Sequence, residues 1–178
     1  MRTRRESDEV LYPDEAVVVV GPADIEELKV AAKGNARCRI RLCSHRNVGD
    51  RVHEMLIVHE RDTYVRPHKH LGKSESFHVI EGLCRVVLLD DVGQVVRIVA
   101  LGDHASGRAF YYRISDPYFH TLVIESDALV FHETTAGPFD PAETVFACWA
   151  PQDGKEARRY LEGLRASVEG TQSTGEGK

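Results

Sequence analysis

The central part of the chain, from Arg39 to Thr134, alternates short apolar runs with turns in a pattern typical of β-strands. Its clearest segment is "CRVVLLDDVGQVVRIVAL", residues 84–101, in which two runs of β-branched residues flank the polar turn "DDVG". This spacing predicts a β-hairpin. We count about eight strands in this region and no helical pattern between them, which predicts an all-β fold, either a sandwich or a barrel.

Helical patterns are confined to the two ends of the chain. "GPADIEELKVAAKGN" has Pro22 in its first turn, acidic residues near its start and Gly34 after its end, so it predicts one short helix. Before it we expect an arm with a short strand at Val17–Val20. Near the C-terminus "KEARRYLEGLRASV" is compatible with a second helix, and the polar "EGTQSTGEGK" predicts disorder. The predicted organisation is an N-terminal arm and helix (1–35), a β domain (36–152) and a C-terminal tail (153–178).

Length and charge limit the class of function. A chain of 178 residues fits one domain and can bury a core without a structural metal or disulfides, so a bound metal would serve function. The net charge of −5 argues against a nucleic-acid partner. No apolar run is long enough to cross a membrane, and the N-terminus "MRTRRESDEV" lacks the apolar segment of a secretory signal. The four cysteines form no C-x-x-C pair, which favours reduced thiols and a cytoplasmic location.

The stretch "RPHKHLGKSESFHVIEG" carries the clearest chemical signal. His68 and His70 are two residues apart, so on a strand their imidazoles point to the same side. "LGKS" can turn the chain, which would bring Glu75 back beside them on an adjacent strand. Two imidazoles and one carboxylate suit a divalent transition metal and leave coordination positions open for water or substrate. The alternative is a pair of solvent-exposed histidines on a polar loop.

This spacing resembles the first motif of the cupins, which is filled here by His68, His70, Glu75 and Gly82. The second cupin motif supplies a further histidine, and His120 in "ISDPYFHTLV" matches it. The resemblance therefore implies a fourth metal ligand, His120.

The sequence departs from the cupin pattern around both motifs. Asp62 stands where the first motif has its leading glycine. Ser115 and Pro117 replace the proline and the glycine of the turn that precedes the second histidine, and Ile124 replaces an asparagine that often follows it. The turn before His120 must therefore be built differently from that of other cupins.

Further segments extend the likeness over residues 37–151: "LGDHASGRAFYYRISDPYFHTLVIESD", "LVFHETTAGPFDP" and "FACWAP" resemble the WbuC-type cupin metalloproteins. The resemblance implies a single cupin barrel of jelly-roll type with one bound divalent metal, iron, manganese, zinc or nickel. Proteins of this type are often encoded among bacterial surface-polysaccharide (O-antigen) genes. The resemblance also implies a homodimer, formed through an edge sheet or by the N-terminal arm adding a strand to its partner, with a monomer as the alternative.

Three further residues are candidates for the site. Glu133 and His132 are neighbours on a strand, so only one of them faces inwards; we choose Glu133, as a proton shuttle, with a surface carboxylate as the alternative. In "FYYR" the side chains also alternate, and Tyr112 and Arg113 are candidates for the pocket, although the pattern leaves open which of them faces inwards. Either would suit an anionic or sugar ligand near a metal.

Other residues have structural interpretations. His78 lies three positions after Glu75, so by alternation it faces away from the metal. His104 follows a turn and is expected to be exposed, and Lys73, in the turn between the ligands, is expected to be solvated. His53 fits a core histidine of a half-buried strand, and Trp149 is expected to cover one end of the barrel.

Three functional hypotheses follow from such a site. The first is a metal-dependent isomerase or epimerase acting on a sugar or nucleotide-sugar, in which a carboxylate such as Glu133 moves the proton. The second is an iron-dependent dioxygenase. The third is a non-catalytic module that binds or senses a small ligand. The sequence does not decide between catalysis and binding.

Overall fold

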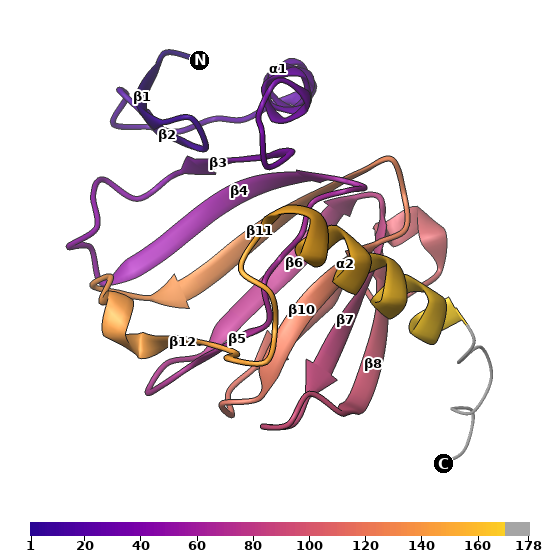
Figure 1. The fold of residues 1–178 in the computed structure, drawn as a ribbon. Coiled ribbons are helices and arrows are strands. Elements are labelled where there is room, and N and C mark those ends of the chain that lie inside the picture. Colours follow the sequence, from indigo (N-terminus) through magenta and orange to yellow (C-terminus); the bar gives the residue numbers. More distant parts are fainter. Residues whose placement is uncertain (170–178) are drawn as a thin grey trace.

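Eight strands between residues 52 and 136 form two antiparallel sheets that face each other (Figure 1). The structure is a computed structural model that describes residues 1–169. One sheet has the order β4-β11-β6-β9 and the other β5-β10-β7-β8. The strands are β4 (Val52–Glu60), β5 (His68–His70), β6 (Glu75–Glu81), β7 (Leu83–Leu89), β8 (Val95–Gly102), β9 (Tyr111–Ile114), β10 (Phe119–Ile124) and β11 (Ala128–Ala136). The chain passes repeatedly from one sheet to the other, and this interleaved Greek-key order is that of a jelly roll.

The arrangement confirms the predicted all-β class but corrects the expected barrel. The two sheets are separate hydrogen-bonded units within the described residues and are not closed into one barrel. The connection from β8 to β9 contains a short 3-10 helix, η1 (His104–Ser106), and a single isolated bridge between Leu101 and Ala109. No strand of one sheet pairs with a strand of the other in residues 1–169, so the fold is a sandwich whose apolar inner faces pack together.

The turns that join the sheets depend on specific residues. Gly82 connects β6 to β7 with φ of +93°, a left-handed conformation that favours glycine. A Cβ at this position would collide with the carbonyl oxygen of Ala128. The predicted hairpin is also present, because β7 and β8 pair directly and Asp90 accepts hydrogen bonds from the amides of Val92 and Gln94.

The N-terminal segment differs from the expected arm. The strand expected at Val17–Val20 is absent, and two other strands, β1 (Thr3–Ser7) and β2 (Val10–Pro13), form a hairpin instead. Strand β2 pairs in parallel with β3 (Arg39–Cys43), which pairs with β4. The first sheet therefore has seven strands and continues across the expected boundary at residue 36. The apolar run that suggested a strand lies outside the sheet, where no partner strand is available to it.

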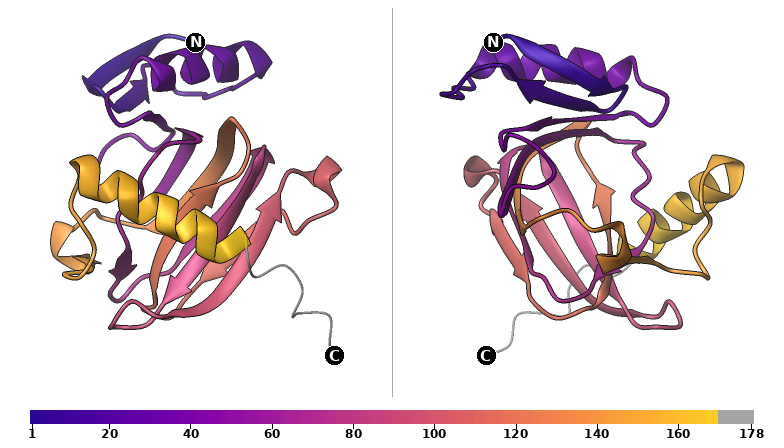
Figure 2. Two further views of the ribbon diagram at one scale, coloured as in Figure 1. Left: turned by 45° about the vertical axis from the view of Figure 1, so that its right-hand side comes forward. Right: turned by 90° about the vertical axis from the view of Figure 1, so that its left-hand side faces the viewer.

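The two predicted helices are confirmed and cover opposite outer faces of the sandwich (Figure 2). Helix α1 (Pro22–Lys33) packs Leu28 and Ala32 on the outer face of the first sheet. Helix α2 (Gly154–Glu169) buries an apolar stripe, including Leu161 and Leu164, on the outer face of the second. Neither is long and apolar enough to cross a membrane, and no other helix in residues 1–169 is. The segment 170–178, for which disorder was expected, lies outside the described residues.

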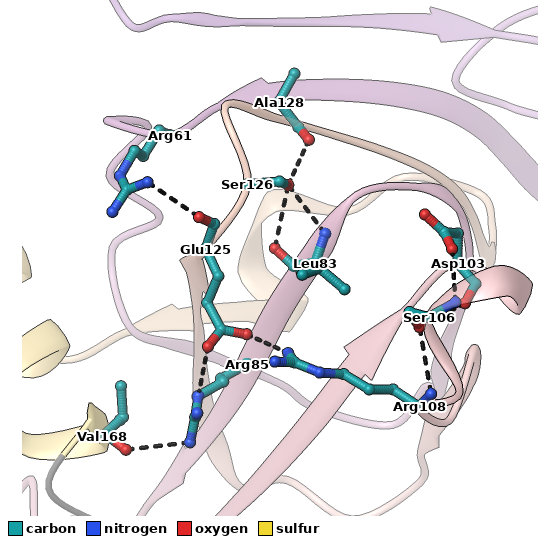
Figure 3. A network of polar contacts seen from close by, with 10 residues as sticks. All are labelled: Arg61, Leu83, Arg85, Asp103, Ser106, Arg108, Glu125, Ser126, Ala128 and Val168. Carbon is teal, nitrogen blue, oxygen red and sulfur yellow. Dashed lines mark hydrogen bonds and ion pairs between the residues drawn. The ribbon is translucent and has the colours of Figure 1, made fainter.

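A network of arginines anchors α2 to the second sheet (Figure 3). The Glu125 carboxylate, at the end of β10, accepts hydrogen bonds from Arg85 Nε at 3.0 Å and from Arg108. Arg85 also donates to the carbonyl oxygen of Val168, in the last turn of α2, at 3.1 Å. Although burial opposes ionisation, the two guanidinium groups lower the pKa of Glu125. The carboxylate therefore stays charged and holds both arginines.

A last short strand completes the second sheet at the edge that carries the histidines. Strand β12 (Thr144–Phe146) pairs with β5, so the sheet order is β12-β5-β10-β7-β8. Between the sheets, the core consists of apolar side chains from both inner faces, among them Ile57, Phe77, Leu122 and Phe131. The histidine-bearing end of the sandwich is the part of this interior where polar side chains replace the apolar ones.

Candidate metal centre

Four predicted site residues converge between the two sheets. His68 and His70 lie on β5, and His120 lies on β10 directly opposite His68. Glu75 is the first residue of β6, which belongs to the facing sheet, so it approaches across the interior and not from an adjacent strand as expected. One ligand atom from each of the four residues lies within 4.8 Å of the other three. This spacing is compatible with one cation bound by all four.

Hydrogen bonds orient the three imidazoles towards a common point. His68 Nδ1 lies 2.9 Å from the carbonyl oxygen of Arg66, and His120 Nδ1 lies 3.1 Å from that of Tyr118. A carbonyl oxygen only accepts, so these Nδ1 atoms carry the proton and the Nε2 atoms keep their lone pairs. His70 Nδ1 lies 3.2 Å from Thr144 Oγ1 on β12. In all three residues Nε2 is thus the atom directed towards the centre, the outer-shell arrangement found around metal-bound histidines.

The carboxylate completes the donor set. Glu75 is buried, with Oε2 at 2.9 Å from His70 Nε2 and Oε1 at 3.6 Å from His120 Nε2. Although burial favours its protonated form, the hydrogen bond with His70 Nε2, which a bound cation would replace, and the neighbouring imidazoles lower the pKa of Glu75 to about 2. Burial and the imidazole of His120 lower the pKa of His68 to about 3. A carboxylate and a neutral imidazole are the protonation states that bind cations.

The residues fit a divalent transition metal. His120 Nε2 is buried and has no hydrogen-bond partner among the described residues, which is costly unless a ligand occupies that direction. Three nitrogen donors and one oxygen donor suit iron, manganese, zinc or nickel. His68 and His70 remain partly exposed, so solvent or a small molecule can approach from their side.

Tyr112 and Arg113 face opposite ways, as neighbours on a strand must. Tyr112 points inwards and is 8% exposed, and its hydroxyl is buried without a hydrogen-bond partner among residues 1–169. Burial, together with the charge of Glu75, raises the pKa of this phenol, so it stays protonated and can donate. Arg113 lies on the outer face and donates to Ser74 Oγ at 2.7 Å. The expectation of Arg113 beside the metal is therefore corrected, and Tyr112 is the inward member of the pair.

Glu133 also faces the interior. On β11 it lies opposite Met55 on one side and Phe77 on the other, both core residues. Burial and the charge of Glu75 raise the pKa of Glu133 to about 8. The Glu133 carboxyl group is therefore protonated in most molecules near neutral pH. Its role as a proton shuttle stays a prediction.

Two polar residues near the site were not recognised from the sequence as part of it. Lys73 was expected to be solvated, but its side chain is only 6% exposed and its ammonium lies 3.3 Å from Glu143. The positive charge of Lys73 also lowers the pKa of Glu133, although burial and the charge of Glu75 raise that pKa by more. Thr144, which orients His70, lies far away in sequence and carries no local signal. The contact of Lys73 with Glu143 and that of Thr144 with His70 both form because the segment of η2 (Pro141–Glu143) and β12 pairs with the strand that carries the histidines.

The remaining histidines lie outside the centre. His78 is exposed and faces away from the centre, as the alternation predicted, and His104 is exposed, as expected. His53 is buried, as expected for a core residue, and stacks on His45 with ring centroids 4.1 Å apart, but its Nε2 has no hydrogen-bond partner among the described residues. His59 is buried between the strands, and burial lowers its pKa to about 3. Trp149 packs against Phe119 on the outer face of the second sheet, so it covers a sheet face rather than an end of a barrel.

Two surface hollows lie elsewhere on the protein. The larger, about 560 Å³, is lined by residues of α2 and the segment before it, including Trp149 and Tyr160. The smaller, about 220 Å³, lies near Arg61 and Arg165. Neither hollow is lined by any of the four converging residues, so the candidate site is identified by its cluster of metal-binding side chains and not by a surface hollow.

Fold and site together define a jelly-roll sandwich with a candidate metal centre. A family model described as "Domain of unknown function (DUF6016)" matches residues 20–101. No curated protein matches the chain.

Several solved structures resemble part of the fold. Oxalate decarboxylase from Bacillus subtilis matches with 16% identity and a TM-score of 0.45 over 56% of this chain and 24% of its own, so the chain spans about a quarter of that protein. The capsular polysaccharide assembling protein CapF from Staphylococcus aureus matches with 19% identity and a TM-score of 0.46, covering 60% of this chain and 32% of its own. Protein SO0799 from Shewanella oneidensis matches with 10% identity and a TM-score of 0.48, covering 75% and 81%. The jelly-roll assignment rests on the strand order and not on these distant matches.

Proposed function

We propose that this chain is a metal-dependent enzyme that acts on a sugar or nucleotide-sugar, as an isomerase or epimerase. The observation that carries the proposal is the convergence of three imidazole Nε2 atoms and one carboxylate beside two inward-facing acid–base groups, Tyr112 and Glu133. A structural metal site has no need of such groups. The resemblance to WbuC-type proteins supports a place in bacterial surface-polysaccharide (O-antigen) biosynthesis.

The chain's own residues supply the remaining chemistry. A divalent cation at this centre would polarise a substrate oxygen and acidify the neighbouring C–H bond. The Tyr112 hydroxyl, which lacks a partner within the described residues, can donate a hydrogen bond to a substrate oxygen. Thr135 lies opposite Glu75, and Glu133 is two residues from Thr135, so the backbone of Glu133 is displaced by about 7 Å along the strand direction from that of Glu75.

Glu133 is suited to moving a proton on a substrate that lies between the sheets. A carboxyl group whose pKa is raised by burial can accept and return a proton near neutral pH. In an isomerisation the proton leaves one carbon and returns to its neighbour on the same face, so a single carboxylate can serve both steps. In an epimerisation the proton returns to the opposite face, which requires a second acid on that side of the substrate. The apolar side chains of Met55 and Phe77 beside Glu133 keep this carboxyl group largely out of water.

The test begins with metal analysis of protein purified without chelator or nickel resin. We expect about one equivalent of zinc, manganese or nickel, and exchange of a substrate C–H proton with deuterium from heavy water when sugars are added. Bound iron with oxygen uptake would replace the proposal by a dioxygenase. Ligand-induced stabilisation without turnover or exchange would replace it by the binding module. A protein without metal would contradict all three.

A further inference from the structure

A single row of residues crosses the inner face of the second sheet and passes through the candidate metal centre. Phe146 pairs with His68, His68 with His120, His120 with Leu88, and Leu88 with Arg97. Residues directly opposite one another on neighbouring strands project to the same face. Arg97 on the edge strand β8 therefore leaves the sheet on the same side as the two histidines.

The distance along this row is within reach of a long side chain. Neighbouring strands lie about 4.8 Å apart, so the backbone of Arg97, two strands from His120, is about 10 Å from it. Leu88, the residue between them, is apolar and belongs to the core, so it offers the guanidinium no partner. The arginine is thus placed to reach towards a molecule at the centre without being one of its ligands.

Arg97 has no partner of its own in the described part of the chain. None of residues 1–169 forms a hydrogen bond or an ion pair with its guanidinium, and the side chain is exposed. The other arginines of this region, Arg85 and Arg108, both hold Glu125 (Figure 3). The Arg97 guanidinium is therefore free to donate hydrogen bonds to a bound anion.

The facing sheet contributes a second donor to the same space. Tyr112 lies on β9, which ends the first sheet as β8 ends the second, and its side chain points into the space between the sheets. The Tyr112 hydroxyl is buried and unpartnered within the described residues. A guanidinium and a phenol that both lack an acceptor are complementary to a group that only accepts, namely a carboxylate or a phosphate.

We propose that Arg97 and Tyr112 bind the anionic group of a sugar substrate whose hydroxyl or carbonyl oxygens lie at the metal centre. The inference rests on the proposed function and narrows its substrate class to sugar acids and sugar phosphates. The planar guanidinium donates two parallel hydrogen bonds to the anion, and the phenol adds one from the other sheet. The anion sets the orientation of the sugar relative to the metal and to Glu133.

The experiment compares three sugars that differ in charge. Metal-loaded full-length protein is titrated calorimetrically with glucose, glucuronate and glucose 6-phosphate, which are neutral, a carboxylate and a phosphate. The variants are Arg97→Met and Tyr112→Phe, neither of which removes a hydrogen bond among the described residues. Arg113→Met and Tyr111→Phe are matched controls, because they make the same changes on the outer face of β9. Metal content is measured for every protein.

We expect at least one of the anionic sugars to bind about tenfold or more tightly than glucose, and Arg97→Met to abolish this preference without changing metal content. Tyr112→Phe should weaken the same anion, and both controls should bind like wild type. Comparison of glucuronate with glucose 6-phosphate identifies the anion.

Three results would overturn the inference. Equal binding of glucose and both anions, binding of none of them, or an unchanged charge preference in Arg97→Met would each do so while leaving the metal-centre proposal intact, provided that metal is bound. Wild-type protein that takes up no metal would overturn both proposals together. Metal content therefore separates failure of the inference from failure of the function.

Discussion

Thr144 offers a direct test of how the metal centre is held. His68 and His120 are oriented by main-chain carbonyls, which no substitution removes, whereas His70 is oriented by the Thr144 hydroxyl at 3.2 Å. Thr144→Val removes this oxygen and keeps the shape of the side chain. Substitutions of groups that orient metal ligands reduce metal affinity by about 10- to 100-fold, or about 1.4–2.7 kcal/mol. Folding should change less, because one hydrogen bond contributes about 1 kcal/mol net.

The assay is a competition titration of metal-free protein against a coloured chelator, with zinc and manganese as probe ions. Thr144→Ser keeps the hydroxyl and should stay within about threefold of wild type, since only a methyl group is lost. Thr134→Val makes the same change on β11, next to Glu133, and should leave affinity unchanged. Wild-type affinity in Thr144→Val would refute the argument that His70 binds through Nε2 while Nδ1 donates to Thr144. An unfolded Thr144→Val with a folded, tightly binding Thr144→Ser would leave it standing.

Further predictions concern the centre and the core. His70→Ala should lower metal occupancy by at least about 100-fold while the circular dichroism spectrum stays that of a β protein; full occupancy would show that the ligand assignment is wrong. Glu133→Gln should keep its metal, as measured by atomic emission, and lose about 100-fold in proton exchange; a large loss of ion would make Glu133 a ligand. The pKa of His59 is lowered from 6.5 to about 3 in the folded protein, so between pH 7.5 and 5.5 only the unfolded chain binds a proton at this residue. The free energy of unfolding should therefore fall by about 1.4 kcal/mol over this range because of His59. Urea titrations should show this loss to be smaller by that amount in His59→Leu and unchanged in His104→Asn; equal pH dependence of wild type and His59→Leu would count against it.

Local patterns in the sequence identified the elements of the fold and much of the site. Alternating apolar residues predicted the β7–β8 hairpin, and capping residues predicted α1, because both signals act over a few neighbouring residues. The spacing of His68 and His70 placed both imidazoles on one side, since strand alternation fixes that geometry without any partner. The glycine at position 82 marked a turn that only a residue without Cβ can make.

Prediction failed where the outcome depended on a partner strand. Val17–Val20 has strong β propensity but no neighbouring strand to pair with, whereas the polar segment Thr3–Ser7 pairs with β2 and becomes a strand. Alternation showed that Tyr112 and Arg113 face opposite ways but could not show which faces inwards. That choice is made by the pairing of Tyr112 with Phe77 in the core.

The sequence by itself determined an all-β chain with terminal helices and four residues able to bind a cation. Only the tertiary structure decided that Glu75 reaches the histidines from the opposite sheet, that Lys73 is buried against Glu143, and that Arg97 lies in the same row as His68 and His120. The physical reason is that register between strands distant in sequence follows from packing the two sheets together. A residue such as Arg97, which carries no local signal, gains its position from two successive strand pairings.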